Sequence, residues 1–159
     1  KLRINIPPGV DSGTKLRVSG EGNAGLKGGP SGDLYVFIKV KNDPKLKRDG
    51  INIYSEISIS YLQAILGDTV SIDTVDGKVD LKIPGGTQPN STLTLENKGV
   101  PRLGNPVARG NQEVLIKVKL PTRINEDERN LLEKLASHYS NQNQTTNSGL
   151  FSKFFGKDS

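Results

Sequence analysis

Short segments that alternate polar and apolar residues recur along the chain. Residues 1–6, 51–59 and 79–83 all follow a period of two. Successive side chains of a strand point to opposite faces, so this alternation indicates strands with one packed face and one wet face. Such strands are typical of antiparallel sheets, and the pattern therefore predicts a mainly β protein.

The two halves of the chain resemble each other at an offset of about 77 residues. IPPGVDSGTKLRVSGEG (Ile6–Gly22) matches IPGGTQPNSTLTLENKG (Ile83–Gly99), and GDLYVFIKV (Gly32–Val40) matches GNQEVLIKV (Gly110–Val118). In both copies a strand runs into a Pro-Gly turn, crosses a polar loop and resumes. A repeat of this length is too long for a solenoid unit and predicts a duplicated domain.

Two local signals divide the second half. Asp76-Gly77, between Val70–Val75 and Lys78–Ile83, predicts a hairpin with a type I′ turn, in which both central residues have positive φ. Tyr61–Leu66 is rich in Leu, Ala and Gln and predicts a short helix that ends at Gly67.

A longer helix is predicted near the C-terminal end. Asn125 and Glu128 have the spacing of a capping box. The apolar stripe that follows consists of Leu131, Leu132, Leu135, Ala136 and Tyr139. The polar segment from residue 140 predicts disorder. The chain closes with an amphipathic patch made of Leu150, Phe151, Phe154 and Phe155.

The composition excludes several kinds of chemistry. The chain has no Cys and a single His, His138, which removes disulfides, thiolate catalysis and cysteine-ligated zinc. We expect His138 at the surface of the long helix, and we predict no catalytic residues, no metal site and no cofactor. The net charge of +5 is scattered among acids, which does not favour nucleic acid, and no apolar run has the length of a membrane span.

Two motifs imitate functional sites. Gly20–Gly25 spells G-x-G-x-x-G, but the glycine-rich segment after it cannot form the helix that a dinucleotide site needs, so we expect a loop. Asp73, Asp76 and Asp80 are close enough in sequence for acid–base work. Their place on or beside a hairpin favours solvated turn residues instead.

Several motifs occur in an order that resembles one family. PPG, GDLYV, KRDG, the TVDG hairpin and K-G-V-P follow one another over about residues 1–139. In this order they resemble the C-terminal region of class A DnaJ co-chaperones. The residues of these motifs are most similar to those of the plastid and bacterial-type branch. The Phe-rich ending is also similar to bacterial-type tails of that family.

The resemblance implies a mainly β fold with two tandem β-sandwich-like domains and a short dimerisation helix. Its expected divisions are residues 1–44 for the part of the first domain that follows the zinc-finger insertion, 45–122 for the second domain, 123–139 for the helix and 140–159 for a flexible tail. The chain begins without Met in a predicted strand, so we expect a piece of a longer protein.

The family also implies how the chain works. An unfolded or nascent polypeptide adds as a strand to the edge of the first domain and places an apolar side chain in a pocket. By resemblance, the pocket residues are Leu2, Ile4 and Leu46. A place in the core is the alternative for all three, and it is an equal alternative only for Ile4. The resemblance assigns Leu131, Leu132, Leu135 and Tyr139 to a homodimer contact.

The sequence departs from the family in what it lacks. It has neither the His-Pro-Asp tripeptide of the J domain nor the Cys-rich repeats, so zinc is expected only in that missing module and stimulation of the seventy-kilodalton heat-shock chaperone lies elsewhere. The expected compartment is the plastid stroma or, alternatively, the bacterial cytoplasm. The alternative function is a structural β-sandwich module for scaffolding or adhesion, without a client groove.

Overall fold

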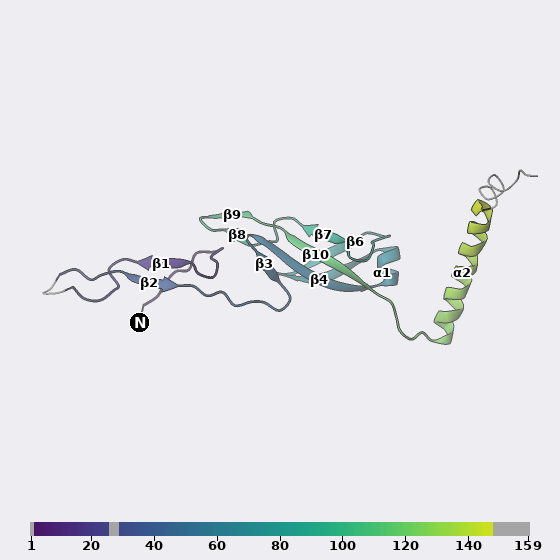
Figure 1. Cartoon of the computed structure of the whole chain (residues 1–159), viewed down its shortest axis with the longest axis horizontal. Coiled ribbons are helices and arrows are strands. Elements are labelled where there is room, and N and C mark those ends of the chain that lie inside the picture. The colour runs from purple at the N-terminus through teal and green to yellow at the C-terminus, as the bar shows by residue number, and fades with distance from the viewer. Residues whose placement is uncertain (1, 26–28, 148–159) are drawn as a thin grey trace, which may run out of the picture. The chain divides into compact units, whose positions relative to one another are not determined.

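The computed structural model describes residues 2–25 and 29–147, with side chains to residue 139, and its fold is mainly β (Figure 1). The strands run in chain order as β1 (Lys15–Val18), β2 (Leu34–Phe37), β3 (Lys47–Asp49), β4 (Asn52–Ser60), β5 (Asp68–Thr74), β6 (Gly77–Ile83), β7 (Thr92–Leu95), β8 (Pro101–Arg102), β9 (Asn105–Arg109) and β10 (Gln112–Lys119). The helices are α1 (Tyr61–Leu66) and α2 (Glu126–Asn147).

A four-stranded mixed sheet forms the centre of the second half. Its strand order is β3-β4-β10-β7, with β10 parallel to β4 and antiparallel to β7. The hairpin β5-β6 and the helix α1 cover one face of this sheet. The core between them is apolar and consists of Ile59, Ala64, Ile72, Leu81, Ile83, Val114 and Ile116. The two packed layers give the sandwich-like arrangement that alternation predicts.

The internal repeat is confirmed at the level of hydrogen-bonded register. Leu16 of β1 lies opposite Val36 of β2, and Leu93 of β7 lies opposite Val114 of β10 at the matching positions. The turns after the two Pro-Gly segments also match, because Gly9 and Gly86 have φ values of 87° and 83°. The second copy is built into a larger sheet, while β1 and β2 pair only with each other in the described chain.

The predicted hairpin and short helix are both present, with one error in the turn. α1 spans the predicted residues, and Ser60 and Gln63 form a capping box at its start. β5 and β6 pair with Val75 and Asp76 as the two loop residues. Gly77 has a φ of 112°, whereas Asp76 is not in the left-handed region, so the type I′ prediction is wrong. The glycine follows the loop instead of standing inside it.

The first predicted strand is absent. Residues 2–6 form no strand, and Leu2 and Ile6 are exposed. Alternation indicates which side chains of a segment favour burial. A β-strand also requires a neighbouring strand to which its backbone can hydrogen-bond. No other segment of the described chain pairs with residues 2–6.

The described residues divide into two compact units, and the division falls between Lys119 and Leu120. Within the first unit, Arg48 of β3 donates to the carbonyl oxygens of Val10 at 2.6 Å and Gly9 at 2.9 Å. Contacts therefore cross the division expected at residue 44, and that division stays a prediction.

In the second unit, α2 begins with the predicted capping box. The backbone N–H of Asn125 donates to Glu128 Oε2, and the backbone N–H of Glu128 donates to Asn125 Oδ1, both at 2.8 Å. The helix is assigned to Asn147, which overlaps the segment from residue 140 for which the sequence predicts disorder, and that prediction stays untested. No Gly or Pro interrupts that stretch, and each added residue contributes one more helical hydrogen bond. The Phe-rich patch lies outside the described residues.

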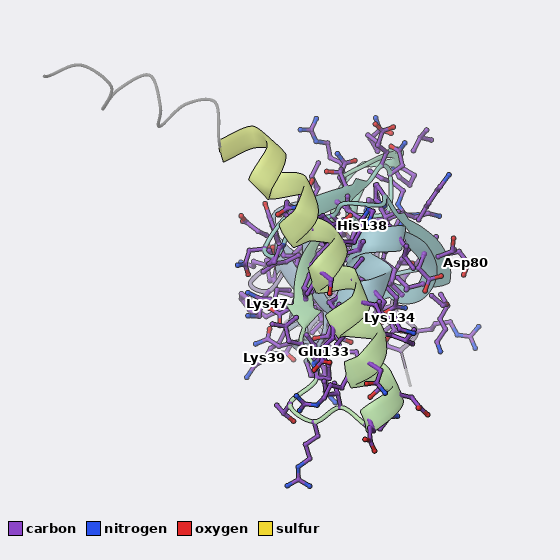
Figure 2. All side chains as sticks on the ribbon, turned by 90° about the vertical axis from the view of Figure 1, so that its right-hand side faces the viewer. Lys39, Lys47, Asp80, Glu133, Lys134 and His138 are labelled. Carbon is purple, nitrogen blue, oxygen red and sulfur yellow. The ribbon has the colours of Figure 1, made fainter. Side chains whose placement is uncertain are left out.

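Glu133, Lys134 and His138 project from α2, as Figure 2 shows. His138 is exposed as predicted. No helix in the described residues is both long enough and apolar enough to cross a membrane.

Candidate functional site

The candidate site is a groove of about 940 Å³ beside β4. β3 pairs with β4 only at Asn52–Tyr54, whereas β4 continues to Ser60. In the described part of the chain, Ser55–Ser60 therefore have a ladder partner only on β10, and their other edge is open. An open edge presents backbone N–H and C=O groups to any extended segment that approaches it.

The two sides of this edge differ because successive residues of β4 point to opposite faces. The side that faces the core contributes Leu46, Ile57 and Ile72 to the groove. Ile72 is only 5% exposed, and Leu46 and Ile57 are half-buried. This wall is therefore apolar and already largely formed.

The opposite side of the sheet supplies a mixed wall. The register places Glu56, Leu115 and Thr92 in one row across β4, β10 and β7. The adjacent row runs from Lys47 of β3 (labelled in Figure 2) through Tyr54 to Glu113. Both rows line the groove, and this face is not covered by another layer of the described chain.

One ion pair borders the groove. Lys45 Nζ lies 2.7 Å from Asp73 Oδ2. The hydrogen bond from Lys45, together with its charge, lowers the pKa of Asp73 below its usual value, and Asp73 raises the pKa of Lys45 in the same way. The pair is solvent-exposed, so its contribution to the stability of the fold is small.

The buried side-chain amide of Gln112 connects the strands around the groove by hydrogen bonds. Gln112 has no exposed surface, and its Nε2 donates at 2.9 Å to Ser55 Oγ and to the backbone oxygen of Asp73. One side chain thereby ties β4 and β5, which lie on two sides of the groove, to β10. We assign Gln112 as a positioning residue.

The three predicted pocket residues are not brought together. Leu46 lines the groove, whereas Leu2 and Ile4 do not. Ile4 is half-buried and Leu2 is exposed, and their role stays a prediction. Of the predicted dimer contacts on α2, Leu131, Leu135 and Tyr139 are exposed and Leu132 is half-buried, and their role stays a prediction.

The motifs that imitate enzymes have structural roles. Gly20–Gly25 lies in the loop after β1, as expected. Asp76 binds Arg109, with Nη1 to Oδ2 at 2.8 Å and Nη2 to Oδ1 at 3.0 Å, which ties the β5-β6 turn to β9. Because Asp73 and Asp76 are each in an ion pair, the expectation that they are merely solvated was incomplete. Among the described residues, no group of three His, Cys, Asp or Glu side chains is placed to hold a metal ion.

The remaining groove residues were not identified from the sequence. They include Tyr54, Glu56, Ile57, Ile72 and Leu115. One signal was available, because the Asp49-Gly50 turn joins a short strand to a much longer one, and strands of unequal length leave an open edge. The partners across the groove come from β5 and β10, which only the topology brings near.

Comparison with known proteins identifies the family. The model of the DnaJ C terminal domain matches residues 1–121. The chain belongs to the DnaJ C-terminal domain family. Its match to that family covers β1 to β10, including the groove and the open edge of β4.

Three of the curated relatives that the chain matches are cyanobacterial DnaJ proteins. The chain is 84% identical over 159 residues to the chaperone protein DnaJ of Prochlorococcus marinus subsp. pastoris, covering all of this chain and 42% of that protein. It is 66% identical over 160 residues to that of Prochlorococcus marinus strain MIT 9313 and 58% identical over 157 residues to that of Cyanothece sp. PCC 7425. These matches cover 99% and 98% of this chain and 42% of each relative. The chain thus spans about two fifths of the DnaJ proteins that it matches.

Proposed function

We propose that this chain is the client-binding and dimerising part of a DnaJ-type co-chaperone. It holds unfolded polypeptide for delivery to the seventy-kilodalton heat-shock chaperone and catalyses no reaction. The cyanobacterial relatives favour the bacterial cytoplasm over the plastid stroma. The single observation that carries the proposal is the open edge of β4 beside an apolar groove.

The geometry suits a binder of many sequences. Backbone hydrogen bonds to an added strand do not depend on the client sequence, while the wall of Leu46, Ile57 and Ile72 favours a large apolar side chain. Burial of one such side chain is worth about 1.5–3 kcal/mol. Each site is therefore weak by itself.

Dimerisation would strengthen this weak grip. Two grooves in one homodimer bind a long client with higher avidity than either groove alone. The exposed stripe of Leu131, Leu135 and Tyr139 on α2 supports such a contact, because exposed apolar side chains gain by burial against a second copy.

Truncation after Pro121 should give a folded monomer, and sedimentation of the truncated and the full chain measures this. A monomeric full chain at about 10–100 µM, where an ordinary micromolar dimer assembles, would remove this part of the proposal.

Anisotropy of a fluorescent unfolded peptide tests client binding. Leu46→Ser should weaken binding about tenfold, because most of the transfer free energy of one buried side chain is lost. Leu103→Ser is the matched control, since Leu103 is exposed and does not line the groove. A third variant, Leu2→Ser, tests the first domain separately.

The outcomes distinguish the remaining alternatives. Weakened binding in Leu2→Ser with intact binding in Leu46→Ser would move the client to the first domain. Absence of peptide binding by the unmodified chain would favour the scaffolding or adhesion module.

A further inference from the structure

The two walls beside the open edge of β4 have different chemistry. A strand that adds to this edge sends alternate side chains to opposite faces of the sheet. One set meets the apolar wall made by Leu46, Ile57 and Ile72, and the other set meets the wall that begins at Glu56. Selectivity therefore depends on two adjacent client residues.

Glu56 is the first side chain that such a strand meets on the outer face. Its row continues to Leu115 on β10, and Glu56 is exposed. Glu113, the other acid of this wall, accepts a hydrogen bond from Thr94 Oγ1 at 2.8 Å. In the described part of the chain, Glu56 makes no ion pair. Its carboxylate is thus available to a client.

The lysines near the groove do not cancel this charge. Lys45 is engaged with Asp73 at 2.7 Å. Lys47 lies in the row of Tyr54, where β3 already occupies the edge of β4. A client strand that pairs with β4 past the end of β3 therefore has a residue opposite Glu56, and this position is one row away from Lys47.

We propose that this groove selects extended segments in which a large apolar residue stands directly beside Lys or Arg, with Glu56 as the specificity-determining residue. This inference rests on the proposed client binding and adds a charge preference to it. Opposite charges at directly facing positions of neighbouring strands attract, and like charges there repel. The apolar residue faces Ile57 while its basic neighbour faces Glu56.

Three fluorescent nine-residue peptides test the preference on the full chain. Each has a central Phe in a Gly-Ser-Gln frame, flanked on both sides by Lys, by Gln or by Glu. The Lys peptide should bind about three- to fivefold more tightly than the Glu peptide, from the usual size of a facing charge pair. The difference should shrink at about 1 M salt, where the screening length is about 3 Å.

Charge reversal identifies the residue. Glu56→Lys should reverse the order of the Lys and Glu peptides and leave the Gln peptide within about twofold of its original affinity. Glu96→Lys makes the same change in net charge at an exposed position outside the groove, and should preserve the original order. An unchanged order in Glu56→Lys, with the Gln peptide still bound, overturns this inference and leaves client binding intact. Failure of all three peptides to bind the unmodified chain overturns client binding itself.

Discussion

The amide of Gly99 donates a hydrogen bond to the carbonyl oxygen of Gly110 at 2.8 Å, and the same bond joins Gly22 to Gly32 at 2.7 Å in the first copy of the repeat. The surroundings of the two acceptors differ. A Cβ on Gly110 would collide with the backbone of Ile51, whereas a Cβ on Gly32 would meet only Asn23 at an ordinary distance of 3.8 Å.

Replacement of these two glycines should therefore have unequal effects. Gly110→Ala is expected to lower the free energy of unfolding by about 1–3 kcal/mol, because the added methyl group forces backbone apart. Gly32→Ala, its counterpart in the repeat, should change it by less than about 0.5 kcal/mol. Urea denaturation of both variants measures the difference. Equal effects would show that the repeat does not differ in packing at this bond.

Gln112→Leu should destabilise the sheet by about 1–3 kcal/mol. The replacement leaves the Ser55 hydroxyl and the Asp73 carbonyl without their buried donor. Ser55→Ala is the milder control, since Gln112 keeps its bond to Asp73. Urea denaturation gives both values, and peptide anisotropy should show weaker binding in Gln112→Leu because β4 and β5 are no longer tied together. A Gln112→Leu variant as stable as the parent would contradict the role given to this amide.

Stability should fall at acid pH through two ion pairs. Hydrogen bonds from Lys45 and Arg109 lower the pKa values of Asp73 and Asp76 below their ordinary value of 3.8. A group with a lowered folded pKa stabilises the fold fully above its unfolded pKa, and that stabilisation is lost as the pH falls through the folded value. The loss is therefore expected below about pH 3.8.

The dependence of stability on pH at the acid end identifies the carboxyl groups responsible. Asp73→Asn and Asp76→Asn should each flatten the dependence of the urea midpoint on pH below that value. Asp80→Asn is the control, because no ion pair in the described chain involves this carboxyl (labelled in Figure 2). If the urea midpoint of the Asp73/Asp76 double variant depends on pH as that of the parent does, the acid sensitivity belongs to other groups.

Asn125→Ala should reduce the helicity of α2 while leaving the sheet intact. The Asn125 side chain accepts from the Glu128 amide, and loss of an N-cap of this type costs about 1 kcal/mol. Circular dichroism at 222 nm and the midpoint of urea denaturation report the helix and the sheet separately. Ser137→Ala, in the middle of the same helix, should leave the helical signal unchanged or slightly increased. An unaltered signal in Asn125→Ala would mean that tertiary or dimer contacts hold the helix.

Local features could be predicted from the sequence because their causes are local. The capping box at Asn125, the helix ended by Gly67 and the duplicated Leu16 and Leu93 all depend on neighbouring residues or on the repeat. The absent strand at residues 2–6 and the position of Glu56 at an open edge depend instead on which strands pair. That information is distributed over segments far apart in sequence, so alternation alone gave neither, and only the unequal strands joined at Asp49-Gly50 pointed to the open edge.

The parallel pairing of β4 with β10 also determines when this sheet can form during synthesis. The side-chain bond between Asn52 and Asn111 spans 59 positions. At translation rates of about 5–20 residues per second, the first of these strands waits roughly 3–12 s for the other. During that interval β4 lacks the strand with which it pairs over Ile53–Ser60. A nascent chain of this protein is then itself an extended apolar segment of the kind that its finished groove is proposed to hold.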